Sequence, residues 1–239
     1  MMLLKLTSIN EILLRWDKSA AISMNIQLID ENVGGLLPGQ LHMVQGVPGS
    51  GKTWFCFHAI DCLFRKITDA QVLYSDFQGH VRIPNLKKII SSSNQLDQIT
   101  FYQPTSLLEQ IIFFRNLVEK DKTFYDLIIL DTIFGPPLDF IHCLRESKMW
   151  GKQIFSYLFD LGQLARKNRI PILLTNYLTQ DGDISSSNTI SQPHWKAFLE
   201  PLVPIDFIIE KVEGYFTIEV KLFQEPLGQT DFVLIPSKS

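Results

Sequence analysis

The feature that most constrains this chain is the stretch GVPGSGKT, which matches the pattern G-x-x-x-x-G-K-[ST] at every fixed position. An apolar run at residues 41–45 precedes it and favours a strand, and residues 53–60 favour a buried helix. In such a turn, backbone N–H groups converge on phosphate oxygens, and the helix N-terminus adds partial positive charge. The alternative is a plain glycine-rich turn. The predicted phosphate-binding residues are Gly46, Val47, Pro48, Gly49, Ser50, Gly51, Lys52 and Thr53.

Three side chains of this prediction have individual roles. In a phosphate loop, Lys52 would reach the β- and γ-phosphates and the Thr53 hydroxyl would hold Mg²⁺. Residues 125–131 form the clearest predicted strand, a continuous apolar run of the kind covered on both faces of a sheet, and it ends in Asp131. In phosphate-loop proteins an Asp at the end of such a strand supports the Mg²⁺ ion, and we predict this role for Asp131. The alternative is a solvated strand end.

The predicted elements alternate over residues 40–176, which indicates a parallel sheet covered by helices. After the loop helix we expect strands at residues 71–76, 99–102, 125–131 and 170–176. We also expect a short helix that starts at Pro84 and two longer helices at residues 105–120 and 153–168. The later strands, at 205–209, 215–223 and 232–235, read as an antiparallel extension. We divide the 239 residues into an N-terminal helix or linker, 1–24, and a core, 25–239.

Composition excludes several classes of protein. The net charge of −3 argues against a chain whose whole surface attracts nucleic acid. Cys56, Cys62 and Cys143 have no metal-binding spacing and are interpreted as reduced thiols of an intracellular protein. The sequence has no uninterrupted apolar run of about 18 residues, so no membrane span is expected.

The run Gly34 to Gly39, seven residues ahead of Gly46, resembles the entry to the ATPase core of RecA-type recombinases. The resemblance covers about residues 25–235 and is nearest to archaeal RadB and the recombinase paralogues. It also rests on the phosphate loop, Tyr74-Ser75-Asp76, the Asp131 strand, Thr175-Asn176 and the β-rich tail. It implies a RecA-like α/β P-loop core that binds ATP and Mg²⁺, with a mainly parallel sheet covered on both faces and a C-terminal antiparallel extension.

The sequence departs from the family pattern at two positions. Active members read Asp-x-Glu-Gly after the second strand, where the Glu activates water, but Gln78 stands there in this chain. An amide can orient water but cannot accept its proton, so slow hydrolysis is expected. Active members also have a Gln after Thr-Asn that senses the γ-phosphate; here it is Tyr177, which predicts weak coupling to DNA.

The DNA-facing loops of the family correspond to residues 135–152 and 179–183. The first carries cations and an aromatic residue that can contact a nucleic-acid backbone and bases: Arg145, Lys148, Trp150 and Lys152. An ordinary solvated surface explains them equally well. The second carries two acidic residues, which opposes strong binding of DNA by this chain alone.

The resemblance implies an ATP-binding mediator of homologous recombination and DNA repair that contacts a recombinase or another paralogue, with turnover weak or absent. Two alternatives remain: a DNA-dependent ATPase acting directly on single-stranded DNA, and a KaiC-like signalling ATPase. The expected location is the cytoplasm of an archaeon or the nucleus of a eukaryote.

Overall fold

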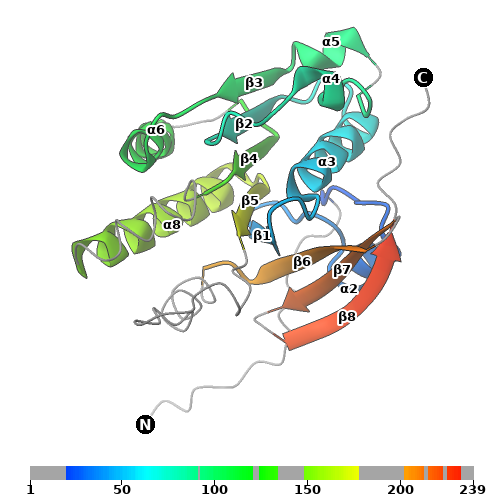
Figure 1. Ribbon diagram of the computed structural model, residues 1–239. Helices are drawn as coiled ribbons and strands as arrows, with labels where there is room; N and C mark the ends of the chain where they lie inside the picture. The colour runs from blue at the N-terminus through cyan, green and yellow to red at the C-terminus, as the bar shows by residue number, and fades with distance from the viewer. Residues whose placement is uncertain are drawn as a thin grey trace.

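An eight-stranded sheet organises the fold (Figure 1). The computed structural model describes residues 20–90, 92–120, 124–133, 148–177, 202–212, 215–222 and 225–232. The strand order is β3-β2-β4-β5-β1-β6-β7-β8. The strands are β1 (Leu41–Gly46), β2 (Val72–Asp76), β3 (Ile99–Tyr102), β4 (Leu127–Asp131), β5 (Ile172–Tyr177), β6 (Ile205–Val212), β7 (Tyr215–Leu222) and β8 (Glu225–Phe232).

The pairing is parallel from β3 across to β6 and antiparallel from β6 through β7 to β8. This confirms the predicted fold class, a mainly parallel sheet with an antiparallel C-terminal extension. The helices are α2 (Gln27–Asn32), α3 (Lys52–Lys66), α4 (Ile83–Leu86), α5 (Ser93–Leu96), α6 (Leu107–Glu119) and α8 (Lys148–Asn168).

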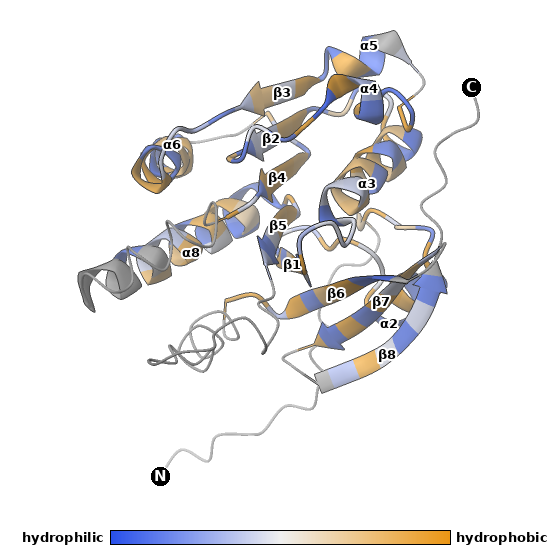
Figure 2. Ribbon diagram, viewed as in Figure 1, coloured by the Kyte–Doolittle hydropathy of each residue, from blue (hydrophilic) through white to orange (hydrophobic). Residues whose placement is uncertain are grey.

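Helices cover both faces of the sheet, and β4 shows why its sequence is apolar throughout. Leu127 and Ile129 point into the core shared with α3, while Ile128 and Leu130 point into the core shared with α6 and α8. Each fully buried aliphatic side chain of this size stabilises the fold by about 1.5–3 kcal/mol. Figure 2 shows the central strands as hydrophobic and α8 as striped, as expected for a half-buried helix.

The starts of α6 and α8 differ in how clearly the sequence marks them. The Ser106 hydroxyl accepts a hydrogen bond from the Glu109 backbone N–H at 3.2 Å and caps α6. Helices α6 and α8 cover the same face of the sheet, and Arg115 of α6 contacts the Asp160 carboxylate of α8 at 3.2 Å. Helix α8 begins at Lys148, whereas the sequence predicted a connection up to residue 152. That prediction was wrong because Gly151, which favours a turn, interrupts the apolar period at the start of this helix.

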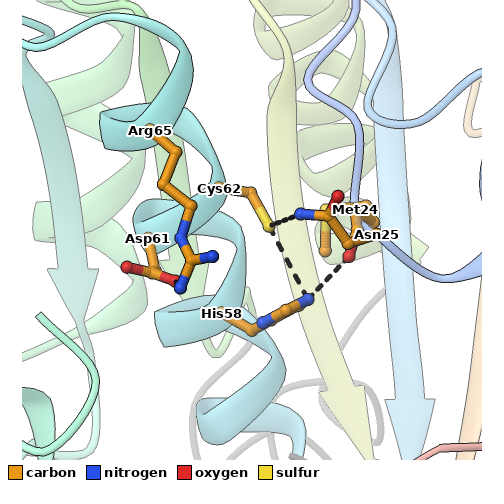
Figure 3. Close-up of polar contacts among 6 residues, drawn as sticks. All are labelled: Met24, Asn25, His58, Asp61, Cys62 and Arg65. Atoms are coloured by element: carbon orange, nitrogen blue, oxygen red, sulfur yellow. Dashed lines mark hydrogen bonds and ion pairs between the residues drawn. The ribbon is translucent and has the colours of Figure 1, made fainter. Parts of the chain in front are cut away.

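The segment before the phosphate loop packs on α3 (Figure 3). The Nε2 atom of His58 lies 2.6 Å from the Met24 carbonyl oxygen, and the Asn25 side-chain amide lies 3.5 Å from the Cys62 sulfur. Asn25 has φ of 52°, a left-handed conformation that Asn tolerates. Burial raises the pKa of Cys62 to about 11, so the thiol is neutral and serves as a packed contact.

Several further predictions can be compared with the structure. Cys56 and Cys62 are buried free thiols, as expected, while Cys143 lies outside the described residues. The domain division at residue 24 stays a prediction, since residues 1–19 are not described. No helix among the described residues is both long and apolar enough to cross a membrane.

The last strand was misplaced by the sequence pattern. It was expected at 232–235, but β8 spans Glu225–Phe232 and contains Pro226 and Gly228, which the pattern treats as turn residues. Within the described sheet β8 is terminal and pairs only with β7. An edge strand tolerates a proline that cannot donate a ladder hydrogen bond.

Candidate nucleotide-binding site

The site lies where the parallel strands end. The sheet order places β4, β5 and β1 side by side, and the register pairs Val44 with Thr175 and Gly46 with Tyr177. The phosphate loop follows β1, Asp131 ends β4, and Tyr177 ends β5. In open α/β sheets this carboxyl edge is where ligands bind.

The phosphate loop has the backbone shape that its glycines allow. Gly49 and Gly51 have φ of 79° and 98°, a region that disfavours any side chain. A Cβ on Gly46 would lie 2.3 Å from the Ser50 hydroxyl oxygen and 2.5 Å from the Ile209 carbonyl oxygen. Helix α3 starts directly at Lys52, and the N–H groups of its first turn have no acceptor within the helix. The loop can therefore present N–H donors to a phosphate.

A buried polar atom also fits an anion in the loop. The Ser50 hydroxyl is buried and has no hydrogen-bond partner among the described residues. Its oxygen lies beside the position that a Cβ on Gly46 would take. An unsatisfied buried hydroxyl is costly unless a ligand or water completes it.

Lys52 is held inside the loop. Its ammonium nitrogen donates to the carbonyl oxygens of Gly46 at 2.7 Å and Val47 at 2.9 Å, and lies 4.3 Å from the centre of the Tyr177 ring. Only 6% of its surface is exposed. Burial lowers the pKa of Lys52 to about 8, and the Asp131 carboxylate opposes that shift. Lys52 therefore remains mostly charged at neutral pH.

Asp131 gathers three hydroxyl groups. Its Oδ2 accepts from Thr53 at 2.7 Å and from Tyr74 at 2.7 Å, and its Oδ1 accepts from Thr175 at 2.6 Å. Thr53 and Asp131 thus lie in contact, although they are 78 residues apart in sequence; their metal role stays a prediction. Burial raises the pKa of the Tyr74 phenol, so this residue stays a donor. The carboxylate is positioned from three elements.

The same pair suits a magnesium ion. Mg²⁺ prefers oxygen ligands and is usually held by one or two protein groups together with phosphates and waters. The Thr53 hydroxyl and the Asp131 carboxylate supply such oxygens beside the loop. The described residues contain no cluster of three or more His, Cys, Asp or Glu that could hold a metal.

Sequence reasoning missed two members of this arrangement, Tyr74 and Thr175. Tyr74 was included only as part of a family-like run, and Thr175 only as a strand end. A signal was present in each case, because a hydroxyl on a buried strand needs a polar partner. The identity of that partner depends on the order of the strands in the sheet, which cannot be read from the sequence.

The two positions that depart from the family pattern touch each other. The Tyr177 hydroxyl donates to the side-chain oxygen of Gln78 at 2.7 Å. Burial raises the pKa of Tyr177, which keeps the phenol protonated. Asp76 is engaged elsewhere, since its carboxylate accepts from the backbone N–H groups of His80 at 3.2 Å and Val81 at 3.0 Å. Asp76 therefore shapes the turn that carries Gln78.

The predicted DNA-contacting residues are only partly placed. Arg145 lies outside the described residues, as does the acidic stretch 179–183. Lys148, Trp150 and Lys152 lie in the first turns of α8, where the backbone but not these side chains is described. Their role stays a prediction.

Comparison with known proteins supports the resemblance seen in the sequence. The chain is 29% identical over 156 residues to a DNA repair and recombination protein RadB from Thermoplasma volcanium, covering 63% of this chain. The match spans 64% of that relative's length. A crystal structure of the RadB recombinase superposes with a TM-score of 0.67 at 19% identity, covering 89% of this chain and 95% of that one. No protein-family model matches. The RecA-like fold and the similarity to RadB are thus confirmed.

Proposed function

We propose that this chain, a RecA-like protein similar to RadB, binds ATP with Mg²⁺ and assists homologous recombination and DNA repair as a mediator. The observation that carries the proposal is the 2.7 Å contact between Thr53 and Asp131, beside a loop that buries Lys52. These groups come from β4 and from the start of α3, and they meet only when the sheet is assembled. A glycine-rich turn that binds no ligand would not require a lysine, a threonine and a carboxylate together at this edge of the sheet.

The residues divide the work of holding the nucleotide. Residues 46–53 would surround the phosphates with N–H groups, and Lys52 would contact the β- and γ-phosphates. Thr53 would bind Mg²⁺ directly, and the adjacent Asp131 carboxylate would support the metal. The bound metal would neutralise charge that develops on the phosphates.

Hydrolysis by this chain alone is slow in the proposal. The water-orienting position is Gln78, which cannot accept a proton and whose oxygen already accepts from Tyr177. Asp76 does not replace the missing base, because its carboxylate accepts from the turn that follows it. A general base typically contributes about 10²- to 10⁴-fold to such a rate. Nucleotide would therefore act by stabilising a conformation rather than by rapid turnover.

The mediator role follows from the similarity to RadB together with the weak hydrolysis. A protein that holds nucleotide without rapid turnover suits a stable complex with a recombinase or another RecA-like paralogue. Single-stranded DNA would bind weakly, through Arg145, Lys148, Trp150 and Lys152. The N-terminal stretch 1–24 would link or dock the core.

A steady-state ATPase assay with and without single-stranded DNA tests this proposal, with Lys52→Ala as the control variant. We expect turnover that stays low in both conditions, together with capture of a RecA-type recombinase from native extract. Strong stimulation by DNA that disappears in Lys52→Ala would overturn the mediator role in favour of a DNA-dependent ATPase.

A further inference from the structure

A hydrogen-bonded bridge crosses the nucleotide-binding edge of the sheet. Tyr177 ends β5, and Gln78 lies in the turn after β2. The sheet order places β4 between those two strands, so the 2.7 Å bond from the Tyr177 hydroxyl to Gln78 spans the end of the strand that carries Asp131. We call Tyr177 and Gln78 the bridge. Both side chains are half-buried, while Asp131 is only 7% exposed.

The bridge also closes one side of Lys52. An ammonium group has three N–H donors, and two of them are used by the carbonyl oxygens of Gly46 and Val47. The Tyr177 ring lies 4.3 Å from the nitrogen, within the range of a cation–π contact. A charge-assisted hydrogen bond to phosphate needs an oxygen at about 2.7–2.9 Å from the nitrogen. A phosphate oxygen that approached the ammonium from the side of Tyr177 would have to displace the ring.

The two terminal phosphates of a nucleotide meet this arrangement differently. The β-phosphate lies within the curve of the loop, surrounded by its N–H groups. The γ-phosphate extends outward, to the lysine and the water-orienting position. In this chain those two places are covered by Tyr177 and held by Gln78. A diphosphate would therefore meet the bridge only at Lys52, whereas a triphosphate would also meet it at the water-orienting position.

We propose that the Tyr177–Gln78 bridge makes this site selective for nucleoside diphosphates over triphosphates until something opens the bridge. The inference rests on the nucleotide binding proposed above and adds a specificity-determining residue, Tyr177. Opening the bridge breaks the half-buried hydrogen bond between Tyr177 and Gln78 and the cation–π contact between Tyr177 and Lys52. Together these shift an equilibrium by about tenfold. A partner that pulls Tyr177 away would therefore also switch the preferred nucleotide.

Two substitutions separate the parts of the bridge, and a third serves as their control. Tyr177→Phe keeps the ring over Lys52 and removes the hydrogen bond. Tyr177→Gln removes both the ring and the phenol. Tyr102→Phe is the matched control, because its hydroxyl contacts the Glu109 carbonyl oxygen at 3.4 Å on another part of the sheet. Thermal unfolding of each variant shows whether it is folded.

The experiment measures dissociation constants for Mg·ADP and for a non-hydrolysable Mg·ATP analogue by calorimetry, on the full chain. We expect wild type and Tyr102→Phe to bind the diphosphate about tenfold more tightly than the triphosphate. Tyr177→Gln should remove that preference, and Tyr177→Phe should reduce it in part.

Equal affinity for both nucleotides in wild type, or a preference that Tyr177→Gln leaves unchanged, would overturn the bridge while leaving nucleotide binding intact. Absence of binding by either nucleotide would overturn the proposed function itself, and the inference with it.

Discussion

The Tyr177 hydroxyl and the Gln78 side-chain oxygen are 2.7 Å apart, although 99 residues separate them in the chain. Each occupies a position where the RecA-type pattern has a different residue, a Glu that activates water in one case and a Gln that senses the γ-phosphate in the other. The contact joins the two departures into one unit. A change at either position should therefore act through the other.

The first prediction concerns restored hydrolysis. Gln78→Glu alone should raise the ATPase rate only slightly, because a carboxylate accepts the Tyr177 hydroxyl more strongly than an amide does. The double variant Gln78→Glu/Tyr177→Gln frees the carboxylate and should raise the rate by about 10²-fold or more. The comparison is made by phosphate release under saturating Mg·ATP. A full gain from Gln78→Glu alone would show that Tyr177 does not restrain this position.

The second prediction concerns pH and nucleotide affinity. The free site holds Lys52 with a pKa of about 8, and a bound phosphate should raise that pKa. The affinity for nucleotide is therefore highest below pH 8, and it falls by up to about tenfold per pH unit as the pH rises above 8. Titrations from pH 7 to 9.5 measure this slope. Lys52→Arg, which stays charged, is the control and should flatten the slope in the same range; an unchanged slope would assign it to another group.

The third prediction concerns acid stability. His42 is fully buried, and its Nε2 accepts from the Leu37 N–H at 2.9 Å, so the ring is neutral. Desolvation lowers its pKa from 6.5 to about 3. Between these pH values the unfolded chain binds a proton at His42 that the folded chain does not bind. The contribution of His42 to the free energy of unfolding is therefore fully present above pH 6.5 and is lost as pH falls. The loss should approach about 1.4 kcal/mol per pH unit.

Urea unfolding at pH 7.5, 6.0 and 5.0 measures that loss. His42→Gln should remove this part of the pH dependence, whereas His80→Gln should keep it, since His80 is exposed on the turn after β2. Identical slopes in wild type and His42→Gln would contradict the assignment.

The fourth prediction concerns the contact between the phosphate loop and the C-terminal strands. A Cβ on Gly51 would lie 2.5 Å from the ring of Phe216 in β7, whereas one on Gly49 would meet nothing within 4 Å. Both glycines have positive φ, so alanine strains the backbone at either position. Gly51→Ala should cost about 1–3 kcal/mol more than Gly49→Ala, from overpacking.

Phe216→Ala should relieve that additional cost. A double-mutant cycle on Gly51 and Phe216 by urea unfolding should give a coupling energy of about 1 kcal/mol or more. Additive effects would mean that the loop and β7 do not restrain each other.

The sequence alone predicted the features that depend on local pattern. The phosphate loop has fixed spacing, and the apolar run ending in Asp131 is long enough to identify a buried strand. Side-chain pairs across the sheet were beyond it, because Tyr74, Thr175 and Tyr177 find their partners only through strand order. The start of helix α8 and the bounds of strand β8 were misplaced because Gly151, Pro226 and Gly228 are residues that favour turns. Those are places where packing, and not local propensity, determines the structure.

The central claim is that Lys52, Thr53 and Asp131 bind a nucleotide together with Mg²⁺. Calorimetric titration of wild type and Lys52→Ala with Mg·ADP, with and without a magnesium chelator, tests it most directly. The account predicts saturable heat in wild type that weakens at least about tenfold on chelation or in Lys52→Ala. Binding that is absent in wild type, or equal in all these conditions, would contradict it.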